Sequence, residues 1–144
     1  INGSAEDAVA AGAMFLFMPH GLSHGMGIDV HDCEAMGERS YDFSALAERA
    51  AASGTCIHRS TWTLKEGTVM SNEPGIYFIP ALIDKSRNEG LYKGIVNYDK
   101  LDNYRTFGGI RIEDDVIVTK DGGRVIGGDK KIPVTVEELE DILS

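Results

Sequence analysis

Histidines are concentrated in one glycine-rich stretch, where His20, His24 and His31 fall within twelve positions. An i, i+4 pair such as His20 and His24 is found in zinc-binding helices. Here, however, the residue after His20 is glycine rather than glutamate, and each glycine in a helix costs roughly 1 kcal/mol. The stretch is therefore predicted to be a loop in which backbone and imidazoles approach a common point. The alternative is histidines that pack or lie at the surface.

Two glutamates lie among strand-forming apolar residues. Glu73 ends a largely apolar run and precedes Pro74, whereas Glu113 is flanked by isoleucines and valines. Burial of a carboxylate is costly unless it is paired with a cation or bound to a metal. For Glu113 the sequence leaves open a salt bridge to Arg111, which is two residues away and so on the same face of a strand. Exposure at a sheet edge is open for both glutamates.

His24, Glu73 and Glu113 together offer one imidazole and two carboxylates. Mixed nitrogen and oxygen donors of this kind suit Mn²⁺, Co²⁺, Fe²⁺ or Zn²⁺ in hydrolytic sites, and the excess of carboxylates favours manganese. The residue types alone do not choose among these metals.

The elements that position these residues are predicted to be both helical and extended. A helix capped by Ser4 is expected to run to about Phe17, to be buried on most sides and to end at Pro19. Alternation in Ile28–His31 predicts a short strand after the histidine loop. Residues 34–58, with a helical patch at 46–52, are expected to form connecting surface without chemical groups.

Further along, residues 68–73 are predicted to form a strand ended by Pro74 and Gly75, after which 76–79 resume the extended pattern. Residues 84–105 are interpreted as a polar connecting segment without regular secondary structure. A strand over 109–118 and a turn at 121–123 follow, and Thr135 with Glu138 predicts a capping box that opens a helix through Leu143. The sequence therefore predicts an α+β domain of mostly antiparallel sheet with flanking helices.

Composition and charge disfavour several classes of partner. The chain of 144 residues has a formal net charge of −9, which disfavours nucleic acid and anionic membranes as partners. No apolar run approaches the roughly 18 residues that span a bilayer. Cys33 and Cys56 are expected to be reduced thiols, which favours a cytoplasmic location. The start, Ile1 to Asp7, lacks a basic segment and an initiator methionine, so the chain is expected to be part of a longer protein.

Three motifs in series resemble the Xaa-Pro dipeptidases, or prolidases, of the pita-bread metallopeptidases. They are FMPHGLSHGMGIDVHD over Phe17–Asp32, SNEPGIYFI over Ser71–Ile79 and FGGIRIEDD over Phe107–Asp115. Their order and spacing are compatible with the family, and the resemblance runs through most of the chain. It implies a domain that forms the C-terminal part of a pita-bread catalytic fold over residues 1–144.

The resemblance also implies the site. Such enzymes hold two divalent metal ions with two aspartates, one histidine and two glutamates, and the last three match His24, Glu73 and Glu113. Glu73 then also serves as general acid and base. His31 is expected to stabilise the oxyanion, and the residues that match the family's substrate-binding group or lie close to it are His20, His31, Arg59 and Arg111. Mn²⁺ is the expected metal, with Co²⁺ or Zn²⁺ as alternatives.

Arg59 favours a dipeptidase over aminopeptidase P, because the matching arginine grips the free carboxylate of a dipeptide, for which a guanidinium suits. The family's aspartate pair lies upstream of the histidine motif, where this chain has only Asp7. The first half of the catalytic domain and the N-terminal domain that shapes a homodimer are likewise expected to be absent, so these 144 residues alone should be inactive. A non-catalytic pita-bread binding module is a further alternative.

Overall fold

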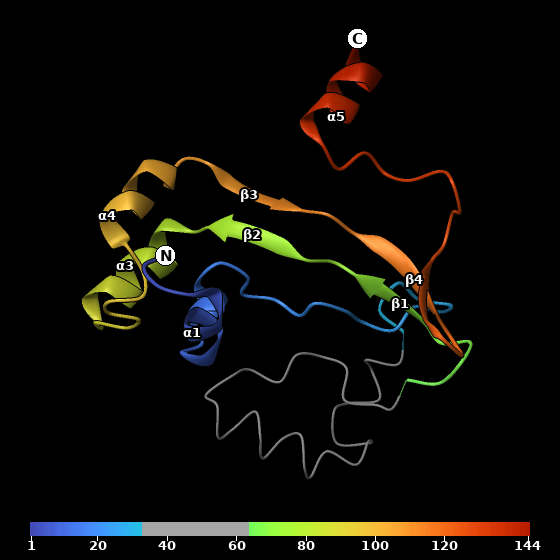
Figure 1. Ribbon diagram of the computed structural model, residues 1–144, viewed down its shortest axis with the longest axis horizontal. Coiled ribbons are helices and arrows are strands. Elements are labelled where there is room, and N and C mark those ends of the chain that lie inside the picture. The colour runs from blue at the N-terminus through green and yellow to red at the C-terminus, as the bar shows by residue number, and fades with distance from the viewer. Residues whose placement is uncertain (33–63) are drawn as a thin grey trace.

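The computed structural model describes residues 1–32 and 64–144 (Figure 1). These residues form short helices and two antiparallel sheets, which confirms the predicted α+β class. The elements are α1 (Ala5–Ala10), the 3₁₀ helix η1 (Ala13–Leu16), β1 (Val69–Asn72), β2 (Gly75–Phe78), α3 (Pro80–Asn88), α4 (Tyr98–Leu101), the 3₁₀ helix η4 (Asp102–Tyr104), β3 (Gly108–Arg111), β4 (Asp114–Thr119), β5 (Gly122–Val125) and α5 (Val136–Leu143).

The strands form two sheets, which are separated at residues 73–74 on one chain segment and 112–113 on the other. β1 pairs with β4, which also pairs with β5, while β2 pairs with β3. The β1–β4 ladder and the β2–β3 ladder lie end to end in Figure 1. Between them, the Ile112 N–H donates to the Pro74 carbonyl at 3.1 Å, which keeps the two chains together across the break. Glu73 and Glu113 both lie at this break.

The strand predictions are confirmed in part. β1 falls within the predicted segment 68–73, whereas β2 begins one residue before the predicted 76–79, at Gly75, and runs in the same direction as β1. The predicted strand over 109–118 is wrong in one respect, because Ile112 and Glu113 separate β3 from β4. The turn predicted at 121–123 lies one residue earlier, at Lys120 and Asp121, because Gly122 and Gly123 belong to β5.

The strand predicted at Ile28–His31 is wrong. This segment bends, and Ile28 is fully exposed, so its alternating pattern has no sheet to bury it. The chain is extended slightly earlier instead, where Gly25 bridges to Met70 and the Met26 N–H donates to the Val69 carbonyl at 3.0 Å. The histidine loop is therefore attached to the free edge of β1.

The helix predicted from Ser4 to Phe17 is broken. Ser4 caps α1 as expected, its hydroxyl accepting the Asp7 N–H at 3.1 Å. Gly12 adopts a φ of 74°, a left-handed conformation that glycine allows without strain and that separates α1 from η1. Within α1 only Ala8 is buried, so the expected burial on most sides is also wrong.

Residues 84–105 are mostly helical rather than a polar connecting segment. Their charged residues misled the prediction, because these side chains pair with one another on the surface while apolar residues face inward. Arg105, for example, binds Asp84 at 2.6 Å and Asp102 at 3.2 Å. The helices contribute to a small core, made of Ala8, Ala13, Leu16, Ile83, Val96 and Leu101.

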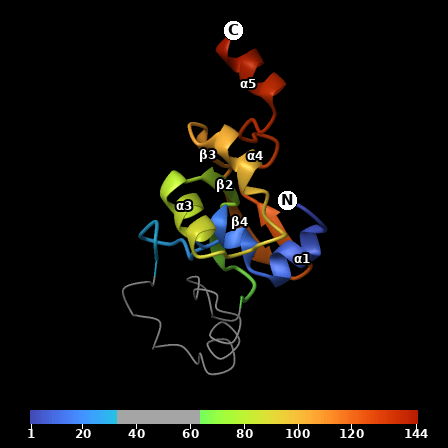
Figure 2. The same cartoon turned by 90° about the vertical axis from the view of Figure 1, so that its left-hand side faces the viewer.

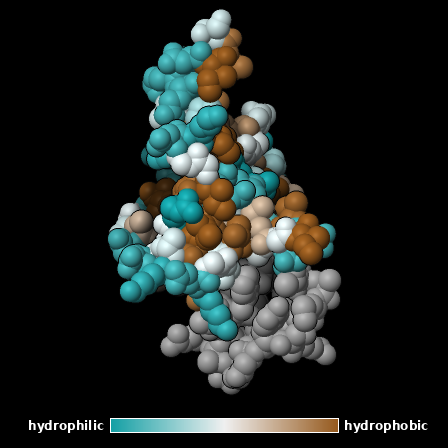
Figure 3. Space-filling model, turned by 90° about the vertical axis from the view of Figure 1, so that its right-hand side faces the viewer, coloured by the Kyte–Doolittle hydropathy of each residue, from teal (hydrophilic) through white to brown (hydrophobic). Residues whose placement is uncertain are grey.

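The C-terminal helix α5 has the predicted capping box, in which Thr135 accepts the Glu138 N–H and Glu138 accepts the Thr135 N–H. The helix stands away from the sheet in Figure 2, and apolar side chains gather along one side of it in Figure 3. None of the helices in residues 1–32 and 64–144 has the length and apolar character that a membrane crossing requires. The predictions for 34–58, Arg59 and the two cysteines lie outside the described residues.

Candidate metal centre

The structure brings His24, Glu73 and Glu113 together, as the sequence predicted for a metal site. One ligand atom from each residue lies within 4.8 Å of the other two. The His24 Nε2 is 3.3 Å from the Glu73 Oε1. His24 and Glu73 are only 2% and 7% exposed, whereas Glu113 is partly exposed. An imidazole and two carboxylates thus converge on one point at the edge of the core.

Three backbone segments place these groups. Asn72 pairs with Asp114, and Gly75 pairs with Arg111, so Glu73 and Glu113 face each other across the break between the ladders. On the other edge of β1, the Glu73 N–H donates to the Leu22 carbonyl at 2.9 Å. The histidine loop therefore lies directly beside the strand that carries Glu73.

The hydrogen bonds of His24 fix its tautomer. A carbonyl oxygen only accepts, so the Nδ1 that lies 3.1 Å from the Gly25 carbonyl must carry the proton. The Nε2 faces the Glu73 Oε1 at 3.3 Å, so it is the ring nitrogen that would bind a metal ion. An imidazole that donates through one nitrogen to a backbone carbonyl and leaves the other free is the arrangement found in metal-binding histidines.

Ser71 lies beneath the cluster and was not singled out in the sequence. Its hydroxyl donates to the Glu73 Oε1 at 3.1 Å and accepts the His24 N–H at 3.0 Å. Its position two residues before Glu73 in a strand puts both side chains on the same face, which is a signal that could have identified it. Ser71 contacts two of the three predicted ligands.

Arg111 lies beside both carboxylates. Its Nε is 3.4 Å from the Glu113 Oε2 and 3.9 Å from the Glu73 Oε2. The hydrogen bond with Tyr77, and then the charges of Glu113 and Glu73, raise the pKa of Arg111 above its usual value. The salt bridge that the sequence left open for Glu113 is therefore present, and it coexists with the cluster.

The two other histidines among the described residues, His31 and His20, make ring contacts with His24 and with Tyr77 respectively. The ring of His31 stacks on that of His24, with centroids 4.1 Å apart. His20 meets Tyr77 edge to face at 5.1 Å and donates through Nδ1 to the Gly21 carbonyl at 2.7 Å. Its Nε2 is buried and has no hydrogen-bond partner among the described residues. Tyr77, which links His20 to Arg111, was also missed, and Arg59 lies outside the described residues.

The residues present fit a divalent metal ion. Two carboxylates share a single guanidinium in a partly buried place, with the His24 imidazole beside them. Uncompensated charge is unfavourable there, and a bound cation would offset it. The nitrogen and oxygen donors suit Mn²⁺, Co²⁺ or Zn²⁺.

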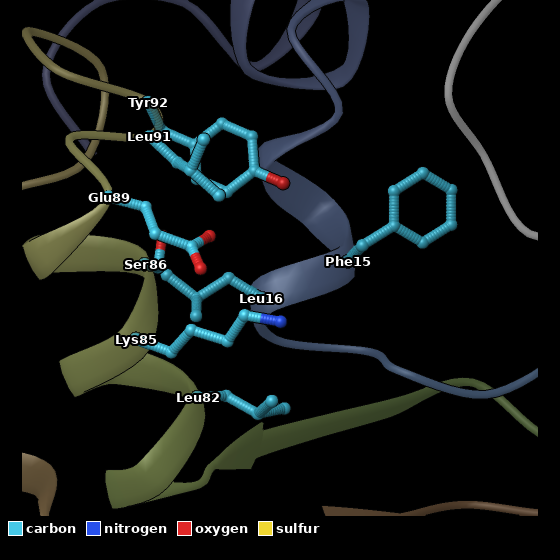
Figure 4. Close-up of a pocket in the computed structure, with 8 residues that line it drawn as sticks. All are labelled: Phe15, Leu16, Leu82, Lys85, Ser86, Glu89, Leu91 and Tyr92. Carbon is cyan, nitrogen blue, oxygen red and sulfur yellow. The ribbon is translucent and has the colours of Figure 1, made fainter.

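A separate cavity of about 170 Å³ lies between η1 and α3 (Figure 4). Phe15 and Leu16 line one side, while Lys85 and Tyr92 lie on the other. None of the cluster residues lines this cavity, so it is distinct from the candidate metal centre.

Comparison with known proteins gives consistent results. The model of metallopeptidase family M24 matches residues 1–120. The human protein named Xaa-Pro dipeptidase is 39% identical over 140 residues, which is 97% of this chain and 26% of that protein. A protein of Paracoccidioides lutzii named probable Xaa-Pro aminopeptidase is 39% identical over 123 residues, 83% of this chain and 24% of that protein.

Solved structures give the same fold. Escherichia coli aminopeptidase P with the inhibitor Pro-Leu has a TM-score of 0.56 and 25% identity over 99% of this chain and 24% of that one. The zinc-substituted form of the same enzyme in complex with product has the same TM-score and identity. The pita-bread fold expected from the sequence is thereby confirmed. The chain spans about a quarter of the length of the curated relatives it matches.

Proposed function

Because this chain belongs to metallopeptidase family M24, we propose that the full-length protein is a metal-dependent peptidase that hydrolyses Xaa-Pro dipeptides. The observation that carries the proposal is the convergence of His24, Glu73 and Glu113 at the break between the two ladders. Relatives named Xaa-Pro dipeptidase and probable Xaa-Pro aminopeptidase support activity on proline peptides.

The full-length protein would hold two divalent ions, foremost Mn²⁺, with Co²⁺ or Zn²⁺ as alternatives. His24, Glu73 and Glu113 supply three of the five ligands that the family resemblance implies, and an aspartate pair supplies the others. When bound, the metal ions provide a Lewis acid for the scissile carbonyl and lower the pKa of water. The 144 residues alone would bind one ion weakly and would not turn over substrate.

Each residue around the cluster has a separate role in this proposal. Glu73 accepts a proton from the attacking water and later delivers it to the leaving proline nitrogen. His31, next to the His24 ring, donates a hydrogen bond to the oxyanion. Arg111 holds both carboxylates in place. His20, whose buried Nε2 has no partner among the described residues, contacts the substrate directly.

Arg59 would distinguish dipeptides from longer peptides, because its guanidinium can form a paired hydrogen bond with the free carboxylate of the proline, which in a longer peptide is an amide. An Xaa-Pro aminopeptidase of the aminopeptidase P type is the alternative that the relatives also support. A non-catalytic binding module is a weaker alternative, since all three matching ligands are present. A cytoplasmic homodimer is part of the same proposal.

The decisive experiment measures turnover of Gly-Pro and of Gly-Pro-Gly by the full-length protein supplied with Mn²⁺. Gly-Pro is expected to be the better substrate, and chelation should abolish turnover until metal is restored. Replacing Arg59 by alanine should lower kcat/KM for Gly-Pro roughly ten- to a hundredfold, the effect of losing a hydrogen bond to a charged group. Gly-Pro-Gly should be less affected.

Arg124→Ala is a matched control, because Arg124 lies on the exposed strand β5. Its kinetic constants should equal those of the unaltered protein. A preference for Gly-Pro-Gly would identify an aminopeptidase instead. Absence of hydrolysis of both peptides in the metal-loaded protein would contradict the proposed activity.

A further inference from the structure

Ser71 is one of the most completely buried side chains in the described residues, with 1% exposure. It lies on β1 at the point where that strand is flanked by β4 on one edge and by the histidine loop on the other. A small polar side chain in such a place is buried at a cost unless its hydroxyl is fully hydrogen-bonded.

The hydroxyl of Ser71 uses its hydrogen bonds on the predicted ligands. Its single proton is donated to the Glu73 Oε1 at 3.1 Å, and a lone pair accepts the His24 N–H at 3.0 Å. One oxygen atom thus joins the carboxylate of one ligand to the backbone of another. These two residues are 49 positions apart in the chain, and this oxygen is a side-chain link between them.

The choice of carboxylate oxygen matters. The Oε1 that receives the Ser71 proton is the oxygen that faces the His24 Nε2 at 3.3 Å, while the Oε2 is turned toward Arg111 at 3.9 Å. A glutamate side chain has several rotatable bonds and would otherwise sample many orientations. Ser71 therefore hydrogen-bonds one oxygen, while the Arg111 guanidinium lies at ion-pair distance from the other.

We propose that Ser71 is a positioning residue of the metal centre, whose hydroxyl aligns Glu73 with His24 before a metal ion binds. This role rests on the metal centre of the proposed function. Groups that orient metal ligands in this way commonly change metal affinity by ten- to a hundredfold when they are removed.

The backbone contacts of Ser71 allow a clean test. The Ser71 N–H donates to the His24 carbonyl at 3.0 Å, and the Ser71 carbonyl accepts the Ser23 hydroxyl at 2.6 Å. Neither bond uses the Ser71 side chain. A substitution at this position therefore leaves the loop attached to β1 and removes only the link between the two ligands.

The experiment compares Ser71→Thr with Ser71→Val in the full-length protein. The two side chains have nearly the same shape and both favour strands, but only threonine keeps the hydroxyl. Calorimetric titration with Mn²⁺ should give an affinity close to that of the unaltered protein for Ser71→Thr. The affinity for Ser71→Val should be about ten- to a hundredfold weaker.

Ser86→Ala is the matched control, because Ser86 is a buried serine of α3 whose hydroxyl bonds to the Tyr98 hydroxyl at 2.6 Å, away from the ligands. It should lower the thermal midpoint of the metal-free protein without changing Mn²⁺ affinity. Equal Mn²⁺ affinities for Ser71→Thr and Ser71→Val would overturn the inference, as would an equal loss in Ser86→Ala. Failure of the unaltered protein to bind Mn²⁺ would instead overturn the metal centre itself.

Discussion

Two clusters of charged side chains in this molecule differ in their ratio of carboxylates to guanidinium groups and in their burial. The first, the surface lattice, joins α3 to α4 and η4. Arg105 binds Asp84 at 2.6 Å and Asp102 at 3.2 Å, and Arg87 binds Asp102 at 2.9 Å. Two arginines neutralise two aspartates, and all four side chains remain partly in contact with water.

The second cluster, the candidate metal centre, has two carboxylates for one guanidinium. Glu73 and Glu113 share Arg111, and the third member is the imidazole of His24. His24 and Glu73 are also nearly inaccessible to water. The surface lattice has one guanidinium for each carboxylate, whereas the candidate metal centre has one guanidinium for two carboxylates, and a bound divalent ion would offset the second. The ratio of carboxylates to guanidinium groups, together with burial, distinguishes the candidate metal centre from the surface lattice.

The largest effect is expected from Glu73→Gln in the full-length protein. The change removes a ligand charge and the proton acceptor while keeping the size of the side chain. Turnover of Gly-Pro should fall by roughly 10²–10⁴-fold, the contribution typical of a general acid–base group. Steady-state kinetics with saturating Mn²⁺ would measure the loss in kcat.

The matched change in the surface lattice is Asp102→Asn, which also removes one carboxylate charge. Because Asp102 is paired within α3 and η4 and contacts none of the cluster residues in the described structure, turnover should stay within about twofold. Equal losses in the two variants would break the distinction between the clusters.

Local signals in the sequence singled out His24, Glu73 and Glu113, and the family resemblance then indicated that they belong to one site. Glu73 and Glu113 are acidic residues in apolar surroundings, and His24 lies in a loop that glycines keep from becoming a helix. The three family-like motifs then supplied the pairing between segments. The capping box at Thr135 was predicted for the same reason, since both partners lie within one turn.

Other features depend on tertiary contacts that periodicity does not encode. The break at Ile112 and Glu113 exists because the opposing strand is also broken at Pro74, across the ladder. Residues of α3 resembled a polar loop because their charges are satisfied by Asp102 and Arg105, which come later in the chain. The role of Ser71 could not be recognised from the sequence, because its contact with His24 joins two segments that are distant in the chain.

A smaller loss of activity than that of Glu73→Gln is expected from a substitution at Gly109, which lies against the Tyr77 ring. A methyl group there would overlap the Tyr77 Cδ1 and come within 3.0 Å of the Ile76 carbonyl oxygen. Gly109→Ala should displace the ring that contacts His20 and bonds to Arg111. We expect a destabilisation of about 1–3 kcal/mol in thermal unfolding and a fall of about tenfold in kcat/KM for Gly-Pro.

Gly123→Ala is the corresponding control outside the site. Gly123 lies on β5, and an added methyl group would meet only a Val116 methyl group at 3.0 Å. This variant is expected to lose some stability and to keep its kcat/KM. A Gly109→Ala protein with unchanged kinetics would show that Tyr77 is not part of the substrate site.

The smallest effect concerns acid stability of the surface lattice. A hydrogen bond from Arg105 lowers the pKa of Asp84 below its ordinary value of 3.8, and a hydrogen bond from Arg87 does the same for Asp102. Below 3.8 the unfolded chain therefore binds more protons at these positions than the folded protein does. The stabilisation is complete above this pH and is lost as the pH falls through the lower folded-state values.

Asp84→Asn tests this contribution, because the amide has no charge to lose in acid. Scanning calorimetry of the unaltered full-length protein between pH 6 and pH 2.5, at about 0.1 M salt, should show a falling midpoint below the ordinary aspartate pKa. The variant should start with a slightly lower midpoint and fall less steeply. At neutral pH its turnover should be unchanged, because the lattice stabilises helices and supplies no group to the metal centre. A variant that loses turnover at neutral pH while unfolding normally would mean that the two clusters are coupled through β3, which follows Arg105 directly in the chain.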